Sequence, residues 1–365
     1  MSHDICHCDW DRSAFQRQDQ PHVSDNLSCI GSDRGLPSAG APAGLPHVAA
    51  SQRWDAIDVA RGLAILAMIV YHFSWDLSFL QLIETNILQI PAWRWFARGI
   101  AGSFLLLAGL GLVLAHARGF RRLPFLKRLA KVGGAALAVT LVTFFAFPES
   151  YIFFGILHCI AASSVLALPF LQLHPALVLL VAIFFFVGPS LFTSPALDAP
   201  YLDWLGLGSA LPVTNDYVPL FPWFGMVLLG IALGKTLLPR AGTLSLARWR
   251  ARNVLSGPIA WAGRKSLPIY LIHQLVLLAL LYGVLQVTGP NPRAEARPFM
   301  NDCVETCIMQ NAEPGMCRSV CSCTVDTLRQ DQGDLWRKVL SGTTTPEDRT
   351  QMSRTAQQCL RRAPS

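Results

Sequence analysis

The sequence predicts an all-α protein. We expect a polytopic membrane helix bundle of about seven transmembrane helices, followed by a small disulfide-stapled helical C-terminal domain. Three observations lead to this prediction. Of the 365 residues, 52% are hydrophobic and only 15% are charged, whereas soluble proteins average about 25% charged residues. Apolar runs close to the ~20 residues that cross a bilayer as a helix recur along the chain. Six of the ten cysteines lie beyond residue 300.

The apolar runs place the membrane spans. Because lipid offers the backbone no hydrogen-bond partners, such runs must be helical. The predicted spans lie near 55–75, 96–115, 130–147, 151–170, 175–193, 219–238 and 266–287. Only the short sequence "PES" separates the third span from the fourth, so we expect a tight hairpin there.

The distribution of positive charge orients these spans. Lys and Arg concentrate in 116–131 and 235–265, whereas 194–218 has none and 76–95 has only Arg94. Loops rich in Lys and Arg remain in the cytoplasm. With seven spans, the N-terminus is therefore cytoplasmic and the C-terminus lies outside. Orientation already accounts for the net charge of +7, so we expect no nucleic-acid partner.

Composition divides the chain into three regions. Residues 1–52 are rich in Pro, Gly and Ser and are predicted to be a disordered tail; 53–288 form the membrane domain; 289–365 form a polar, Cys-rich tail. A metal site in the first region is the less favoured interpretation. Its potential ligands are His3, Cys6, His7 and Cys8.

The cysteines of the last region are spaced for disulfide bonds. In "CVETCIMQNAEPGMCRSVCSC" two C-x3-C pairs flank the turn sequence "NAEPG". Cysteines four residues apart share a helix face, and an extracytoplasmic location preserves disulfides. One of several possible pairings joins Cys303 to Cys321, Cys307 to Cys317 and Cys323 to Cys359. A metal site is the competing interpretation, but zinc sites more often use C-x2-C. Cys159, within a span, is predicted to be a buried apolar residue.

The first predicted span carries an unusual polar stripe. Charged residues inside a membrane helix are costly and indicate a functional site. Asp58 and Arg61 are three residues apart and can pair. His72 and Asp76, four apart, can form a base and its orienting carboxylate. The alternative is that the two pairs lie in the inner and outer head-group layers. The helical positions that share this face are Asp58, Arg61, Ile65, Met68, His72 and Asp76.

Further polar and aromatic residues lie at or within other spans. His158 falls inside the fourth span, and Trp223 begins the sixth at the outer interface. A packed, hydrogen-bonded histidine and an aromatic anchor are their simpler interpretations. His273 lies inside the seventh span, nearer its inner half, with Arg264 and Lys265 at its cytoplasmic mouth. His273 therefore need not belong to the same cluster of side chains as His72. Gly-rich phosphate loops, G-x-S-x-G and H-E-x-x-H are absent from the sequence, so any chemistry relies on histidine and carboxylate.

Four segments of the chain carry a family resemblance. They are "DVARGLAILAMIVYHFSWDL", "FGILHCIA", "LFPWFGMVLLGIALG" and "WAGRKSLPIYLIHQ". Together they resemble the bacterial relatives of the heparan-alpha-glucosaminide N-acetyltransferase catalytic domain over about 53–288. The opening D-x-x-R-G and the closing G-R-x-S-L-x-I-Y-L-x-H-Q are the most specific parts.

The resemblance implies an activity and a location. It implies a multi-pass protein of the bacterial inner membrane that transfers acetyl from cytosolic acetyl-CoA to an acceptor on the far side. The family's H-x-S-W segment maps onto His72, Ser74 and Trp75, followed by Asp76 where the lysosomal enzyme carries Asn. His158 stands where relatives carry Gln or His. The implied partners are the lipid bilayer and an extracytoplasmic glycan or lipid-linked acceptor, with no metal.

These features assign a hypothetical role to each residue. His72 is the general base or acetyl carrier, Asp76 orients it, and His158 stabilises developing charge. Ser74, Trp75 and Trp223 face the acceptor. The residues assigned to acetyl-CoA are Asp58, Arg61, Arg264, Lys265 and His273. The alternatives are a transporter that uses the same histidines, and a membrane anchor for the Cys-rich domain. A transporter often shows repeated halves, which this sequence lacks, and an anchor needs no buried histidines.

Overall fold

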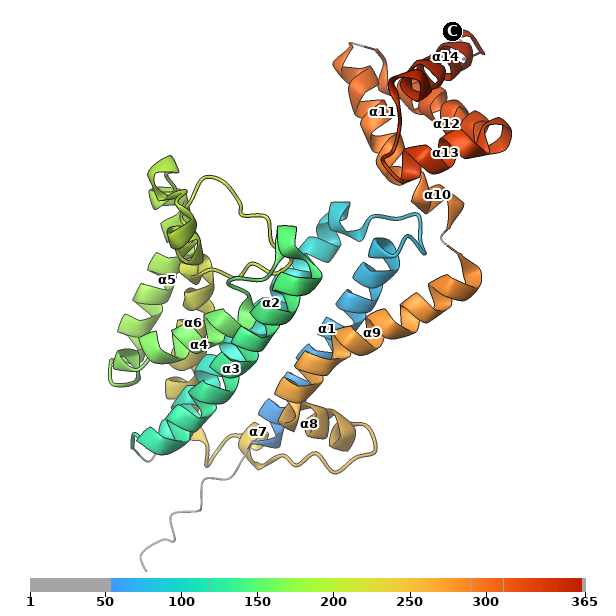
Figure 1. Ribbon diagram of the computed structural model, residues 1–365. Coiled ribbons are helices and arrows are strands. Elements are labelled where there is room, and N and C mark those ends of the chain that lie inside the picture. The colour runs from blue at the N-terminus through green and yellow to red at the C-terminus, as the bar shows by residue number, and fades with distance from the viewer. Residues whose placement is uncertain (1–53, 118, 290, 311, 363–365) are drawn as a thin grey trace, which may run out of the picture. The chain divides into compact units, whose positions relative to one another are not determined.

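The computed structural model describes residues 54–362, except 118, 290 and 311. The predicted tail of residues 1–52 and its four potential metal ligands lie outside the described residues. Every regular element of the described chain is helical (Figure 1). The membrane domain contains α1 (Asp55–Phe79), α2 (Pro91–His116), α3 (Arg122–Ala146), α4 (Ile156–Leu166), α5 (Pro175–Phe192), α6 (Leu220–Leu237), α7 (Ser245–Arg248), α8 (Ser256–Arg264) and α9 (Ser266–Thr288). The C-terminal region contains α10 (Pro292–Glu295), α11 (Arg297–Met309), α12 (Pro314–Asp331), α13 (Gly333–Leu340) and α14 (Pro346–Arg362).

Six of the described helices are long and apolar enough to cross a membrane: α1, α2, α3, α5, α6 and α9. The protein is therefore a multi-pass integral membrane protein, as the sequence predicts. The fourth predicted span, 151–170, differs from this prediction. Its α-helix, α4, has only 11 residues, which rise about 16 Å and do not cross the hydrocarbon core.

The path of the fourth segment continues beyond α4 as a broken helix. A short 3-10 helix, Pro169–Leu171, follows α4, because proline cannot donate the next helical hydrogen bond. The segment's two ends lie beside the two ends of α6. The Val218 amide donates to the Phe154 carbonyl at 3.1 Å, and Lys235 Nζ donates to the Leu171 carbonyl at 2.6 Å. The segment therefore runs the length of α6 without being a single α-helix.

Glycines allow two pairs of helices to pack backbone to backbone. Between α2 and α6, Gly109 faces the Val227 carbonyl and Gly230 faces the Leu106 carbonyl. Between α1 and α8, Gly62 faces the Ile259 carbonyl, and Gly263 faces that of Asp58. A Cβ atom at any of these glycines would overlap the facing backbone. Such small-residue contacts are a common basis of helix association in membranes.

The C-terminal domain forms the disulfides that the cysteine spacing predicts. α11 and α12 are joined twice, and α12 is joined to α14 once. The bonds are Cys303–Cys321, Cys307–Cys317 and Cys323–Cys359. Cys159 is buried and makes no disulfide, as expected. A small apolar core completes the domain; its buried members are Ala296, Val325, Leu328, Leu335 and Trp336.

The glycine packing of α2 against α6 can be tested by adding one methyl group. Gly109→Ala forces the two backbones apart, and we expect it to lower the free energy of unfolding by about 1–3 kcal/mol, the typical cost of overpacking. Gly133→Ala is the matched control, because a Cβ there meets open space. It should be neutral or stabilise α3 by up to about 1 kcal/mol. Thermal unfolding in nanodiscs measures both, and equal midpoints for the two variants would contradict the close contact.

Candidate functional site

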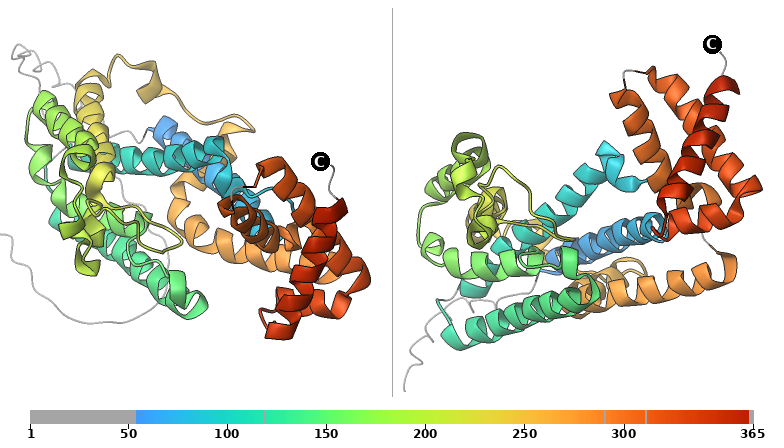
Figure 2. Two further views of the ribbon diagram at one scale, coloured as in Figure 1. Left: turned by 90° about the horizontal axis from the view of Figure 1, so that it is seen from above. Right: turned by 45° about the horizontal axis from the view of Figure 1, so that its top comes forward.

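Four polar side chains meet between α1 and α9, which lie side by side (Figures 1 and 2). The ring centroids of His72 on α1 and His273 on α9 are 5.0 Å apart, edge to face. One helical turn after His72, Asp76 Oδ1 accepts a hydrogen bond from Gln274 Nε2 at 2.6 Å. Asp76 is completely buried. We call His72, Asp76, His273 and Gln274 the α1–α9 polar cluster.

The hydrogen bonds leave this cluster rich in acceptors. His273 Nδ1 lies 2.6 Å from the Tyr270 carbonyl oxygen, which can only accept, so Nδ1 carries a proton. In the neutral ring, Nε2 is then an acceptor. Within the described chain, three buried atoms of the cluster have no hydrogen-bond partner: His273 Nε2, Asp76 Oδ2 and Gln274 Oε1. Because unpaired buried polar atoms are costly, the cluster is suited to a bound group that donates hydrogen bonds, such as an amine or a hydroxyl.

The sequence did not require His273 to lie beside His72. His273 lies in the first half of α9, as expected, and its ring nevertheless meets that of His72. The two histidines meet because α9 does not begin at the same depth as α1. α8 packs beside the start of α1, with Gly263 against Asp58, and α9 follows directly from α8. α9 thus begins beyond the first turns of α1, with Ile269 and Tyr270 packed near Ile65 and Met68, which brings His273 level with His72.

Asp76 differs from its predicted role. We expected it to orient His72 from one turn away. The hydrogen bond that the structure shows joins Asp76 to Gln274 instead. Gln274 is a member of the cluster that sequence reasoning did not assign to the site. The only available signal was an amide inside an otherwise apolar span.

His158 lies in a separate, internally satisfied network. Its Nδ1 accepts a hydrogen bond from the Gly155 amide at 3.3 Å. Its Nε2 lies 3.1 Å from Thr140 Oγ1, which donates to the Ile152 carbonyl and therefore accepts from the ring. Both nitrogens of a neutral ring are paired, and no described contact links His158 to the α1–α9 polar cluster. This favours the simpler interpretation, a packed structural histidine, over a role in charge stabilisation.

The three residues assigned to the acceptor side do not join the cluster through described contacts. Ser74 Oγ donates to the Val70 carbonyl of its own helix at 3.0 Å. Trp75 stacks on Phe79 with ring centroids 4.8 Å apart. Trp223 packs against the apolar core around α6. Ser74 and Trp75 nevertheless lie on the turn of α1 that carries His72 and Asp76.

Basic residues gather at the other end of α1. Arg61 pairs with the buried Asp58, Nη1 to Oδ1 at 3.4 Å, as the stripe predicts. The Arg61 guanidinium reaches Gly111 on α2 and interacts electrostatically with Arg128 on α3. Three helices thus bring two positive groups together, which suits a polyanionic ligand. Arg128 was not among the residues assigned to the cofactor.

An apolar groove lies beside the cluster. It has a volume of about 490 Å³ and is lined by residues of α1, α8 and α9 and by Lys265. Ile69, Trp261, Ile269 and His273 are among the lining residues. Its surface is apolar, which suits the apolar part of an extended co-substrate. Arg264, next to Lys265, is exposed at the end of α8.

Asp216 is a partly buried carboxylate that sequence reasoning missed. It precedes α6, and its Oδ2 accepts from the Ile156 amide at 2.9 Å, at the N-terminus of α4, where negative charge is favoured. Its charge also acts on Tyr71 and Tyr270, the neighbours of His72 and His273. Burial raises the pKa of Asp216 to about 6. In the sequence it is one acidic residue in a long loop, and only the packing of that loop over α4 buries it.

Comparison with known proteins identifies the family to which the chain belongs. Residues 53–275 match the heparan-alpha-glucosaminide N-acetyltransferase catalytic family. The chain belongs to this family. Its members are membrane N-acetyltransferases that use acetyl-CoA as the acetyl donor. No curated protein and no solved structure matches the chain. The matched residues contain the whole α1–α9 polar cluster and end before the Cys-rich domain.

Asp216 should give this acetyltransferase-family protein a defined pH dependence. The folded pKa of about 6 exceeds the ordinary value of 3.8, so between these values the folded protein binds more protons than the unfolded chain. The contribution of Asp216 to stability therefore rises as pH falls from 7 to 4, by about 1.4 kcal/mol for each pKa unit. Thermal unfolding of wild type and Asp216→Asn across this range measures the difference.

Asp198→Asn provides the control for this measurement. Asp198 lies in the same loop before α6 and is exposed, and its hydrogen bond from Ser209 lowers its pKa. Its replacement should leave the stabilisation between pH 7 and 4 in place. Parallel pH profiles for wild type and Asp216→Asn would show that Asp216 titrates normally.

Proposed function

We propose that this protein transfers an acetyl group from cytosolic acetyl-CoA to an amine or hydroxyl group of an extracytoplasmic glycan or lipid-linked acceptor. The observation that carries the proposal is the α1–α9 polar cluster. Its buried acceptor atoms lie inside two membrane helices of a domain whose family consists of membrane acetyltransferases. An amine or hydroxyl acceptor supplies the hydrogen-bond donors that these atoms lack.

The charge distribution supports a donor site at the cytoplasmic end of α1. Acetyl-CoA supplies an acetyl group activated as a thioester and carries several phosphates. Arg61 and Arg128 would hold phosphate oxygens, since guanidinium groups bind phosphate well. Lys265, with Arg264 beside it, would hold a further anionic group beside the groove that His273 also lines. Asp58 would keep the Arg61 side chain in place through their ion pair.

The cluster supports proton transfer at the acceptor. His72 would take the proton that the amine or hydroxyl loses as its nitrogen or oxygen attacks the acetyl carbonyl. The thioester C–S bond would break as the new bond forms, and coenzyme A would leave as the thiol once its thiolate regains that proton. In the alternative route, His72 would carry the acetyl group itself before passing it on. The Tyr270 carbonyl fixes the ring of His273, whose Nε2 would accept a hydrogen bond from the acceptor. Asp76, held by Gln274, would accept another.

The first test is acetyl transfer by wild type and His72→Ala. We expect purified wild type in nanodiscs to bind acetyl-CoA and to turn it over, and the variant to lose about 10²–10⁴-fold in rate, the usual contribution of a positioned base. His174→Ala is the control, because His174 caps α5 and is exposed. Unchanged turnover by the His72 variant would remove His72 from the mechanism.

Acetyl-labelled cofactor separates the two routes for His72. Label that stays on wild type and is absent from His72→Ala supports the acetyl carrier, whereas turnover without retained label supports the general base. Failure of well-folded wild type to bind millimolar acetyl-CoA would contradict the proposal. The intramembrane histidines would then be tested for transport of small anions.

A further inference from the structure

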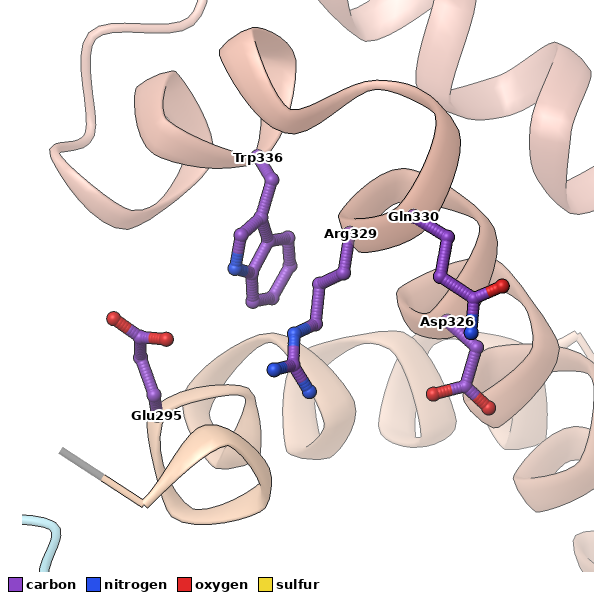
Figure 3. Close-up of a pocket in the computed structure, with 5 residues that line it drawn as sticks. All are labelled: Glu295, Asp326, Arg329, Gln330 and Trp336. Atoms are coloured by element: carbon purple, nitrogen blue, oxygen red, sulfur yellow. The ribbon is translucent and has the colours of Figure 1, made fainter.

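The C-terminal domain contains a polar pocket of about 410 Å³, within the ~300–1,000 Å³ typical of small-molecule sites. Three of its helices line it (Figure 3). α10 contributes Glu295 and α13 contributes Trp336. α12 contributes Asp326, Arg329 and Gln330, which share one helix face because they are three and four residues apart. The pocket lies outside the residues that match the acetyltransferase family.

The indole N–H of Trp336 lacks a hydrogen-bond partner in this pocket. Its side chain is only 6% exposed, and Phe299 packs edge-on against it with ring centroids 5.9 Å apart. Within the described chain its buried Nε1 has no hydrogen-bond acceptor. Figure 3 shows this nitrogen facing the opening above Glu295. A buried indole N–H normally finds an acceptor, and an oxygen atom of a ligand would supply one.

The other lining groups define the chemistry of that ligand. Two carboxylates and one guanidinium leave the pocket with a net negative charge. In the described chain Arg329 forms no salt bridge with Glu295 or Asp326, so all three groups are available to a ligand. Indole, guanidinium and amide N–H groups donate to hydroxyl oxygens, while the carboxylates accept from hydroxyls and bind an ammonium group strongly. A saccharide that carries an amine satisfies all of these groups, and an anionic ligand does not.

Hydrogen bonds fix the pocket close to the outer end of α1. Arg297 donates from Nη1 to Ser78 Oγ at 3.3 Å and from Nη2 to the Ser78 carbonyl at 3.0 Å. The Asn291 amide donates to the Gln81 carbonyl at 2.9 Å. Glu295 of the pocket is therefore two residues from a contact to Ser78, which is itself two residues from Asp76. A polymer held in the pocket would be held near the α1–α9 polar cluster.

We propose that this pocket binds an amine-bearing saccharide and holds the acceptor of the acetyl transfer. Its role as an acceptor site rests on the proposed function, whereas the binding itself does not. The amine of one sugar unit would lie against Glu295, on the side of Trp336, while Asp326, on the other side of Arg329, would accept from a hydroxyl of the neighbouring unit. Hydroxyl oxygens would accept from Trp336 Nε1 and Arg329.

The experiment measures saccharide binding to the full chain in nanodiscs by titration calorimetry. The probe is a β-1,4-linked glucosamine tetrasaccharide, compared with its fully N-acetylated counterpart and with an oligogalacturonate of equal length. We expect the amine-bearing probe to bind at least about tenfold more tightly than either, since a hydrogen bond to a charged group contributes roughly that factor. Equal affinities for the three saccharides, or no binding of the first, would overturn the proposal.

Variants assign the binding to the pocket. Asp326→Asn and Glu295→Gln should each weaken binding of the glucosamine tetrasaccharide about tenfold or more. Asp302→Asn, an exposed carboxylate elsewhere on α11, should not. Trp336→Phe removes only the N–H and keeps the ring. Its thermal unfolding is measured alongside, so that lost binding by a folded variant is distinguished from misfolding. Wild-type affinity in both carboxylate variants would overturn the assignment.

Turnover with monomeric glucosamine separates this proposal from the proposed function. The pocket variants should transfer acetyl to the monomer at the wild-type rate, because none of these residues belongs to the α1–α9 polar cluster. If no acetyl transfer occurs but binding still depends on Asp326, the pocket stands and the proposed function fails. If transfer occurs but the tetrasaccharide binds equally to wild type and the pocket variants, only the pocket proposal fails.

Discussion

The architecture of the site depends on one close contact, the glycine-to-backbone packing of α8 against α1. Gly62 and Gly263 let the two helices approach until backbone touches backbone. Because α9 follows α8 without a loop, this contact sets both the depth and the direction of α9 beside α1. The meeting of His72 with His273, and of Asp76 with Gln274, follows from that placement. Larger side chains at the two glycines would displace the whole second half of the site.

Local features of the site were predictable from the sequence, and relations between distant helices were not. The pairing of Asp58 with Arg61 depends on residues three positions apart on one helix, and the bonds Cys303–Cys321 and Cys307–Cys317 depend on cysteine spacing that a turn folds back. Helical periodicity determines such relations. The bond Cys323–Cys359 joins residues 36 positions apart and followed only as the pair that remained. The position of His273 along α1 depends instead on where α8 packs against the start of α1, because α9 follows α8. No periodic pattern within α9 contains that information.

The same distinction explains the broken fourth span and the partly buried Asp216. The apolar run 151–170 has the composition of a membrane helix, but Pro169 ends its α-helical hydrogen bonding. Asp216 belongs to a loop whose composition predicts solvent exposure. Its carboxylate is partly buried because the loop folds over the N-terminus of α4, where Asp216 Oδ2 accepts a hydrogen bond from the Ile156 amide. In both cases hydropathy indicates which segments are apolar. Specific backbone hydrogen bonds determine where the α-helix ends and where the loop lies.

The surplus of acceptor atoms in the α1–α9 polar cluster has a consequence for the fate of the product. A primary amine has more N–H bonds than the amide that acetylation produces, and a hydroxyl loses its only O–H when it becomes an ester. With either acceptor, the acetylated group therefore satisfies fewer of the atoms His273 Nε2, Asp76 Oδ2 and Gln274 Oε1 than the unmodified group did. Since each buried atom left unpaired costs free energy, the site holds its product less tightly than its substrate. Under the proposed function, product inhibition by the acetylated acceptor is therefore expected to be weak.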